Sequence, residues 1–151
     1  MDILYTLIKI FSGFIIAASA SILIEVPKQF IIHNGIIGLI AYLIYLISDI
    51  YFNNTVSVFL ACLIVTLLAH ISARIFKAPV TVFYIATFFI FVPGTAIYEF
   101  AYYLIQADEL KSANSLTEAL NIAGAVALGV FIGDSILDIY VYFHQLNRQN
   151  S

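Results

Sequence analysis

The chain has 151 residues, of which 63% are hydrophobic and 10% are charged, and its formal net charge is −3. A soluble domain carries about 25% charged residues, so this chain folded in water would expose large apolar patches. The composition therefore excludes a soluble protein, offers no basic cluster for a nucleic acid, and indicates an integral membrane protein.

Five apolar segments are long enough to cross a bilayer, which takes about 20 mostly apolar residues in a helix. They are residues 3–24, 34–52, 56–76, 80–107 and 116–143. Such continuous runs do not fit a β-barrel, whose strands alternate over about ten residues. We therefore predict an all-α, polytopic transmembrane helical bundle of five spans, which forms a single transmembrane domain over residues 1–151.

The first segment also has features of a cleavable signal peptide. Lys9 precedes an apolar run, and Ala18-Ser19-Ala20 mimics a cleavage site. The apolar run continues beyond that site to Ile24. We therefore favour an uncleaved first helix.

The positive charges orient the predicted bundle. Four of the six Lys and Arg residues fall on one side, namely Lys28, Arg74, Lys77 and Arg148. Cytoplasmic loops of membrane proteins are enriched in Lys and Arg, so we predict that this side is cytoplasmic, with the N-terminus outside and the C-terminus inside. The longest connection, residues 108–115, is predicted to be polar and external. Glu118 follows shortly after it and is placed on the same side.

The fourth segment is interrupted at its middle by Pro93 and Gly94. Proline removes a backbone donor and glycine permits a sharp change of direction. We therefore predict two half-helices, residues 80–91 and 95–107, with Thr95 capping the second. A half-helix N-terminus at the membrane midplane offers free N–H groups to an anionic substrate group. The alternative is an ordinary proline kink.

Three carboxylates lie well inside the fourth and fifth predicted spans. Glu99 follows the Pro93-Gly94 break, while Asp134 and Asp138 share a face of the fifth span. A carboxylate in lipid costs at least about 2.5 kcal/mol and is usually functional, so Glu99 and Asp134 are candidates for proton coupling or substrate contact. The alternative for Glu99 is a neutral, hydrogen-bonded carboxyl, and Asp138 could simply reach the cytoplasmic interface.

Small residues form a stripe on the fifth segment, at Ala125, Gly129 and Gly133. This spacing permits close approach of another helix, so we predict a helix interface there. An odd number of spans argues against two inverted halves within one chain. If an inverted pair exists, its other half lies on another polypeptide.

His70 and Cys62 lie inside the third segment. We expect an interhelical hydrogen bond or simple packing for the histidine and a small buried hydrophobe for the cysteine. The sequence has no further ligands at metal spacing, no Ser/His/Asp arrangement and no nucleotide-binding fingerprint. We therefore expect no metal, no cofactor and no enzymatic activity.

Five stretches form a pattern that extends over most of the chain. They are Val26-Pro27-Lys28, Asn34-Gly35, Ala78-Pro79, the residues FVPGTAIY at 91–98, and Ala123-Gly124 through Gly133. This pattern resembles the C-terminal membrane half of the threonine/serine exporter family. The resemblance implies the small subunit of the split form of that family, which pairs with a larger membrane subunit in a bacterial inner membrane. It also implies proton-driven export of small amino acids or small carboxylates, and leaves the substrate open.

We therefore predict a subunit of a secondary-active exporter. Its substrate and ion pathway is predicted to comprise Pro93, Gly94, Thr95, Tyr98, Glu99 and Asp134. The alternative is a non-transporting assembly or regulatory subunit, in which the polar residues only hold helices together. A water-filled cavity that reaches Glu99 would favour the exporter, and a lipid-sealed Glu99 would favour the assembly subunit.

Overall fold

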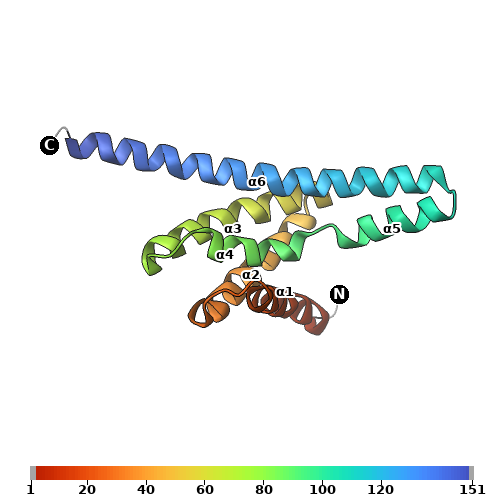
Figure 1. Cartoon of the computed structure of the whole chain (residues 1–151), viewed down its shortest axis with the longest axis horizontal. Helices are drawn as coiled ribbons and strands as arrows, with labels where there is room; N and C mark the ends of the chain where they lie inside the picture. The colour runs from red at the N-terminus through yellow and green to blue at the C-terminus, as the bar shows by residue number, and fades with distance from the viewer. Residues whose placement is uncertain (1–2, 150–151) are drawn as a thin grey trace.

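The structure is a computed structural model that describes residues 3–149, with side chains described for residues 4–137 and for Ile139. The regular elements in that range are helices: α1 (Ile3–Leu23), α2 (Lys28–Asp49), α3 (Asn54–Phe76), α4 (Thr81–Phe88), the 3-10 turn η1 (Phe89–Phe91), α5 (Gly94–Ile105) and α6 (Glu109–Gln149). Four helices are long and apolar enough to cross a membrane, and α4 with η1 and α5 forms a bent pair that counts as a fifth span. The predicted all-α bundle with a broken fourth span is confirmed (Figure 1).

Helices α1, α3 and α5 end in the same way, at a residue with a left-handed backbone. These residues are Glu25, Lys77 and Ala107, with φ of 56°, 51° and 57°. The next amide donates to a carbonyl five residues back, as from Val26 N–H to Ser21 O at 2.9 Å. This Schellman arrangement satisfies late helix carbonyls and turns the chain back within a few residues.

The predicted polar loop over residues 108–115 is wrong, because α6 already begins at Glu109. Asp108 caps this helix: its Oδ1 accepts a hydrogen bond from the Lys111 amide at 3.1 Å, and its Oδ2 lies 3.0 Å from Lys111 Nζ. The hydrogen bonds from Lys111 hold the pKa of Asp108 below its usual value, so the cap stays ionised at neutral pH. Acidic residues are favoured at a helix amino end, which explains why a polar stretch forms a helix here.

The α1–α2 and α3–α6 contacts are tight because glycines lie in them. A Cβ added to Gly38 of α2 would lie 2.6 Å from Gly13 O and 2.5 Å from Ala17 Cβ, both on α1. Helix α6 approaches α3 through Gly129 and Gly133. Helix α4 packs against α1, α2 and α3, whereas α5 packs mainly against α6. In Figure 1 the α5–α6 hairpin extends beyond the group formed by α1, α2 and α3.

Helix α2 begins at Lys28, not at residue 34 as the sequence predicts, so Asn34 lies inside it. Asn34 is fully buried, and its Nδ2 donates to Ser21 Oγ on α1 at 3.0 Å and to Val82 O on α4 at 2.9 Å. A buried amide needs such partners, because leaving it unpaired costs about 1–3 kcal/mol. This side chain therefore joins three helices.

The two ends of the bundle differ in charge. The rings of Phe30 and Phe76 lie 5.5 Å apart, which brings the start of α2 next to the end of α3. This end, here called the cation end, carries Lys28, Arg74 and Lys77. The opposite end carries the α2–α3 turn at residues 50–53, and is here called the break end because Pro93 lies near it.

Candidate functional site

The chain between η1 and α5 is bent as the sequence predicts, but for a different local reason. Val92 is extended (φ −63°, ψ 125°) and Pro93 has φ −76° and ψ 53°, so that the two helical parts meet at 47°. Gly94 is already helical, and nothing lies within 4 Å of a Cβ added to it. The bend therefore comes from Val92 and Pro93, while Gly94 leaves the backbone open to the space beside it.

Thr95 does not cap α5, contrary to the prediction. Helix α5 begins at Gly94, and its N-cap residue is Pro93, which makes no side-chain cap. The first amides of a helix have no intrahelical acceptor. The amino end of α5 therefore presents backbone donors that no side chain caps.

The neighbours of the break lie toward one end of the bundle. Tyr42 and Tyr45, from the last third of α2, lie beside it together with Asn54, the first residue of α3. The break therefore lies at the level of the α2–α3 turn, and α5 extends beyond that turn (Figure 1). The middle of an apolar sequence segment need not be the middle of the bundle, because here half of the segment belongs to a protruding hairpin.

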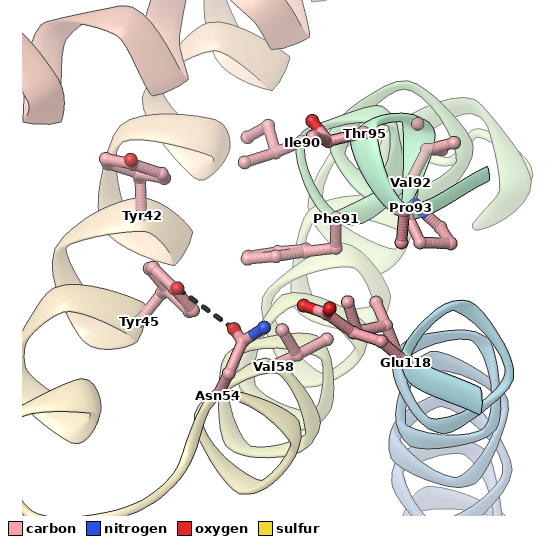
Figure 2. Close-up of a pocket in the computed structure, with 13 residues that line it drawn as sticks. Tyr42, Tyr45, Asn54, Val58, Ile90, Phe91, Val92, Pro93, Thr95 and Glu118 are labelled. Atoms are coloured by element: carbon pink, nitrogen blue, oxygen red, sulfur yellow. Dashed lines mark hydrogen bonds between the residues drawn. The ribbon is translucent and has the colours of Figure 1, made fainter. Parts of the chain in front are cut away.

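A cavity of about 270 Å³ adjoins the break. Its lining residues come from α2, α3, α6 and the break itself: Tyr42, Tyr45, Asn54, Val58, residues 90–96, Glu118 and Ile122. Figure 2 shows the side chains of Tyr45, Asn54 and Glu118 around this space, with Pro93 and Phe91 on the α4–α5 side. The cavity thus brings the predicted Pro93, Gly94 and Thr95 together with polar groups from three other helices.

Glu118 is a cavity residue that the sequence reasoning placed near an external loop. It lies in the amino-terminal part of α6, directly before the buried Ala119. The signal that could have revealed this is a longer small-residue stripe, since buried residues continue at helical spacing before Ala125, at Ser112, Ser115, Ala119 and Ile122. That periodicity indicates one continuous helix through the polar stretch.

Glu99 and Tyr98 lie on α5 and do not line the cavity. Tyr98 is 68% exposed and stacks on Tyr102. Glu99 is half-buried and makes no ion pair or side-chain hydrogen bond with any described residue. The cavity therefore ends before Glu99. A cavity that reaches Glu99 would have favoured the exporter, and this cavity does not reach it.

Asp134 forms a separate polar contact, with a histidine that the sequence had left alone. His70 Nε2 on α3 lies 2.7 Å from Asp134 Oδ1 on α6. This is an interhelical hydrogen bond, one of the two roles expected for His70. With about 1.5 Å per residue, Asp134 lies about 24 Å along α6 from Glu118, so this pair is distinct from the cavity. The Asp138 side chain lies outside the described residues.

The small-residue stripe packs within the chain. A Cβ added to Gly129 would lie 2.9 Å from both Cys62 Cβ and Phe59 O, and one added to Gly133 would lie 2.8 Å from Thr66 Cβ, all on α3. Ala125 is buried in the same row. The expected close packing against another helix is therefore with α3 of the same chain.

The fold and the site together define a class of protein: a multi-span helical membrane protein with a broken helix beside a polar-lined cavity, as secondary transporters have. The family model described as Threonine/Serine exporter, ThrE, matches residues 9–136. The chain belongs to this family, which indicates a membrane protein with a function of the threonine/serine exporter type. Comparisons with curated proteins and with solved structures give no match.

Proposed function

We propose that the chain is one subunit of a secondary-active exporter, which moves small threonine- or serine-like amino acids or small carboxylates and is coupled to protons. The cavity at the broken helix is the observation that carries this proposal. A subunit that served assembly alone would have no need of an open polar space lined by three other helices. The chain acts in this proposal as a single transmembrane domain, residues 1–151.

The cavity offers the groups that a small polar substrate needs. The uncapped amino end of α5 supplies backbone donors for a carboxylate. Across the space, Tyr45 Oη donates to Asn54 Oδ1 at 3.0 Å, which holds the amide in one orientation. The volume of about 270 Å³ fits a small molecule, because pockets for drug-sized ligands begin at about 300 Å³.

Proton coupling in this proposal involves Asp134 and His70, with Glu99 as a second candidate. A carboxylate and an imidazole 2.7 Å apart can exchange a proton across their hydrogen bond. An intramembrane acid is retained at a cost, which is why such residues are commonly parts of proton relays. Glu99 is supported only by its place on α5, one and a half turns beyond Pro93.

A larger membrane subunit of the same family is the proposed partner. Helix α5 packs mainly against α6, and it exposes large apolar side chains: Ile97, Tyr98, Tyr102, Leu104 and Ile105. These side chains need lipid or protein around them. We place the complex in the inner membrane of a bacterium, with the N-terminus outside and the C-terminus inside.

The proposal is tested by efflux of labelled L-threonine and L-serine. The chain is co-expressed with the product of its chromosomal neighbour, purified, and reconstituted into vesicles with an imposed pH gradient. We expect efflux that requires both polypeptides and collapses when the gradient is dissipated. Vesicles that hold either polypeptide alone serve as controls.

Two outcomes would contradict the proposal. If the larger subunit alone transports at the full rate, the chain is an assembly or regulatory subunit. If neither amino acid nor a small carboxylate is moved by the complex, the exporter assignment of this chain fails.

A further inference from the structure

The cavity at the break has a one-sided charge. Its lining contains one carboxylate, Glu118, and no Lys, Arg or His side chain. Glu118 is exposed, and it is the one charged side chain of the lining, so it attracts a cationic group and repels an anionic one. The lining therefore favours a ligand that brings a positive charge.

Glu118 is directed into this space. Figure 2 shows its carboxylate reaching from α6 toward the region between Phe91 and Asn54. It makes no ion pair or side-chain hydrogen bond with any described residue. Lys111, the one lysine of α6, pairs with Asp108 at 3.0 Å instead. Its oxygens are therefore free to accept hydrogen bonds from a ligand.

The facing wall is polar but uncharged. Asn54 accepts the hydrogen bond from Tyr45 through Oδ1, so its Nδ2 remains a donor, and it cannot neutralise Glu118 as a basic residue would. Tyr42 completes this side of the lining. An ammonium group carries three donors and one positive charge, which complements the carboxylate and leaves the Asn54 amide for a hydroxyl or carboxylate oxygen.

We propose that Glu118 binds the ammonium group of the exported amino acid and so selects amino acids against small carboxylates that lack this group. The proposal rests on the export function proposed above and decides between the two substrate classes left open there. A carboxylate without an ammonium group would place a second negative charge near Glu118 with nothing to balance it. The residue is a specificity determinant, and its loss should reduce discrimination more than turnover.

The test uses the complex in vesicles and labelled L-threonine. The competitors are unlabelled L-threonine and 2,3-dihydroxybutyrate, which has a hydroxyl in place of the ammonium group. In the wild type we expect the dihydroxybutyrate to compete at least about tenfold more weakly, as one charge-assisted hydrogen bond provides. Glu118→Gln should raise KM for threonine about tenfold or more, leave the maximal rate within about twofold, and bring the two competitors close together.

Glu109→Gln is the matched control, because Glu109 lies on the same helix outside the cavity and undergoes the same change. We expect it to behave as the wild type. Unchanged discrimination in Glu118→Gln would overturn the role of Glu118 while leaving threonine export intact. A loss of pH dependence with unchanged discrimination would assign Glu118 to proton transfer instead. Absence of threonine efflux in the wild type would overturn the role of Glu118, and it would overturn the export proposal as well only if no small carboxylate is moved either.

Discussion

The hydrogen bond between His70 and Asp134 is a partly buried polar contact that joins α3 to α6. If this pair carries a proton during transport, Asp134→Asn should keep the hydrogen bond and the fold but abolish the response of efflux to an imposed pH gradient, because an amide does not titrate. Efflux of labelled threonine at several external pH values measures this response. An unchanged pH profile would show that the pair is structural.

His70→Gln provides the companion variant, since glutamine can still donate to Asp134. We expect it to lose pH-driven efflux while melting near the wild type in detergent. His70→Ala should instead lower stability by about 1–3 kcal/mol, because it leaves a partly buried carboxylate without its partner. Equal melting temperatures for the two variants would show that the hydrogen bond adds no stability.

Glu99 permits a sharper test, because it contacts neither the cavity nor another charged residue in the described chain. If it couples protons, its action depends on the larger subunit, and Glu99→Gln should abolish pH-driven efflux without changing KM. Glu118→Gln has the opposite expected pattern, a change in KM with pH dependence retained. Normal transport with an unchanged pH profile in Glu99→Gln would leave Glu99 as a structural residue.

At the scale of elements, the break between α4 and α5 is maintained by Pro93. In a continuous helix Pro93 would lie in the interior, where proline costs about 3 kcal/mol more than alanine. Pro93→Ala removes this cost, so α4, η1 and α5 should approach one continuous helix. The change would close the backbone groups that face the cavity. We expect weaker threonine binding even in equilibrium exchange, where no pH gradient acts.

Pro79→Ala is the control for this change, because Pro79 lies in the α3–α4 turn at the cation end, far from the cavity. It should leave exchange near the wild-type rate. Wild-type exchange in Pro93→Ala would remove the broken helix from the substrate pathway.

The α3–α6 contact depends on the absence of a side chain at Gly129. A Cβ there would meet Phe59 O at 2.9 Å, so Gly129→Ala should push the helices apart and destabilise the chain by about 1–3 kcal/mol. Gly124 is on the same helix with nothing within 4 Å, so Gly124→Ala should be neutral or stabilising by up to about 1 kcal/mol. Thermal unfolding in detergent compares them, and equal destabilisation of both would contradict the packing.

The elements themselves could be predicted well, because the length and apolar character of a spanning helix are properties of the local sequence. The helix ends were less predictable. Helix α2 starts before residue 34 because Pro27 begins a helix as well as it ends one, and α6 starts at Glu109 because Asp108 caps it. For α6 a polar stretch was interpreted as a loop, although polar residues are normal in the first turns of a helix.

The site could be predicted only in part. Pro93, Gly94 and Thr95 adjoin the cavity, and a proline between apolar runs indicates a break without any tertiary knowledge. The contribution of Glu118, Asn54 and Tyr45 depends on which helices meet at that level, and the sequence contains no such information. The pairing of His70 with Asp134 was hidden for the same reason, since they are 64 residues apart.

At the scale of the whole molecule, sidedness is a prediction that the bundle makes testable. Lys28, Arg74 and Lys77 lie at the cation end, predicted to be cytoplasmic, and the hairpin turn lies at the other end. A membrane-impermeant thiol reagent should label Asn114→Cys in intact cells but Ser151→Cys only after permeabilisation. Asn114 is exposed, whereas Ser112 is 4% exposed and unsuitable. Cys62, fully buried, should stay unlabelled in the wild type, and equal access of both variants from one side would refute the topology.

The length of α6 has a mechanical consequence. Its 41 residues make a rod of about 60 Å, whereas the hydrocarbon core of a bilayer is about 30 Å thick. Tilting within the usual range, up to about 40°, cannot hide the difference, so α6 projects well beyond the core. Helix α6 packs against α5 near its amino end and against α3 farther along. A tilt of the α5–α6 hairpin beside the break would therefore move the carboxyl end of α6 in the opposite direction. A conformational change on one face of the membrane would in this way move residues on the other face.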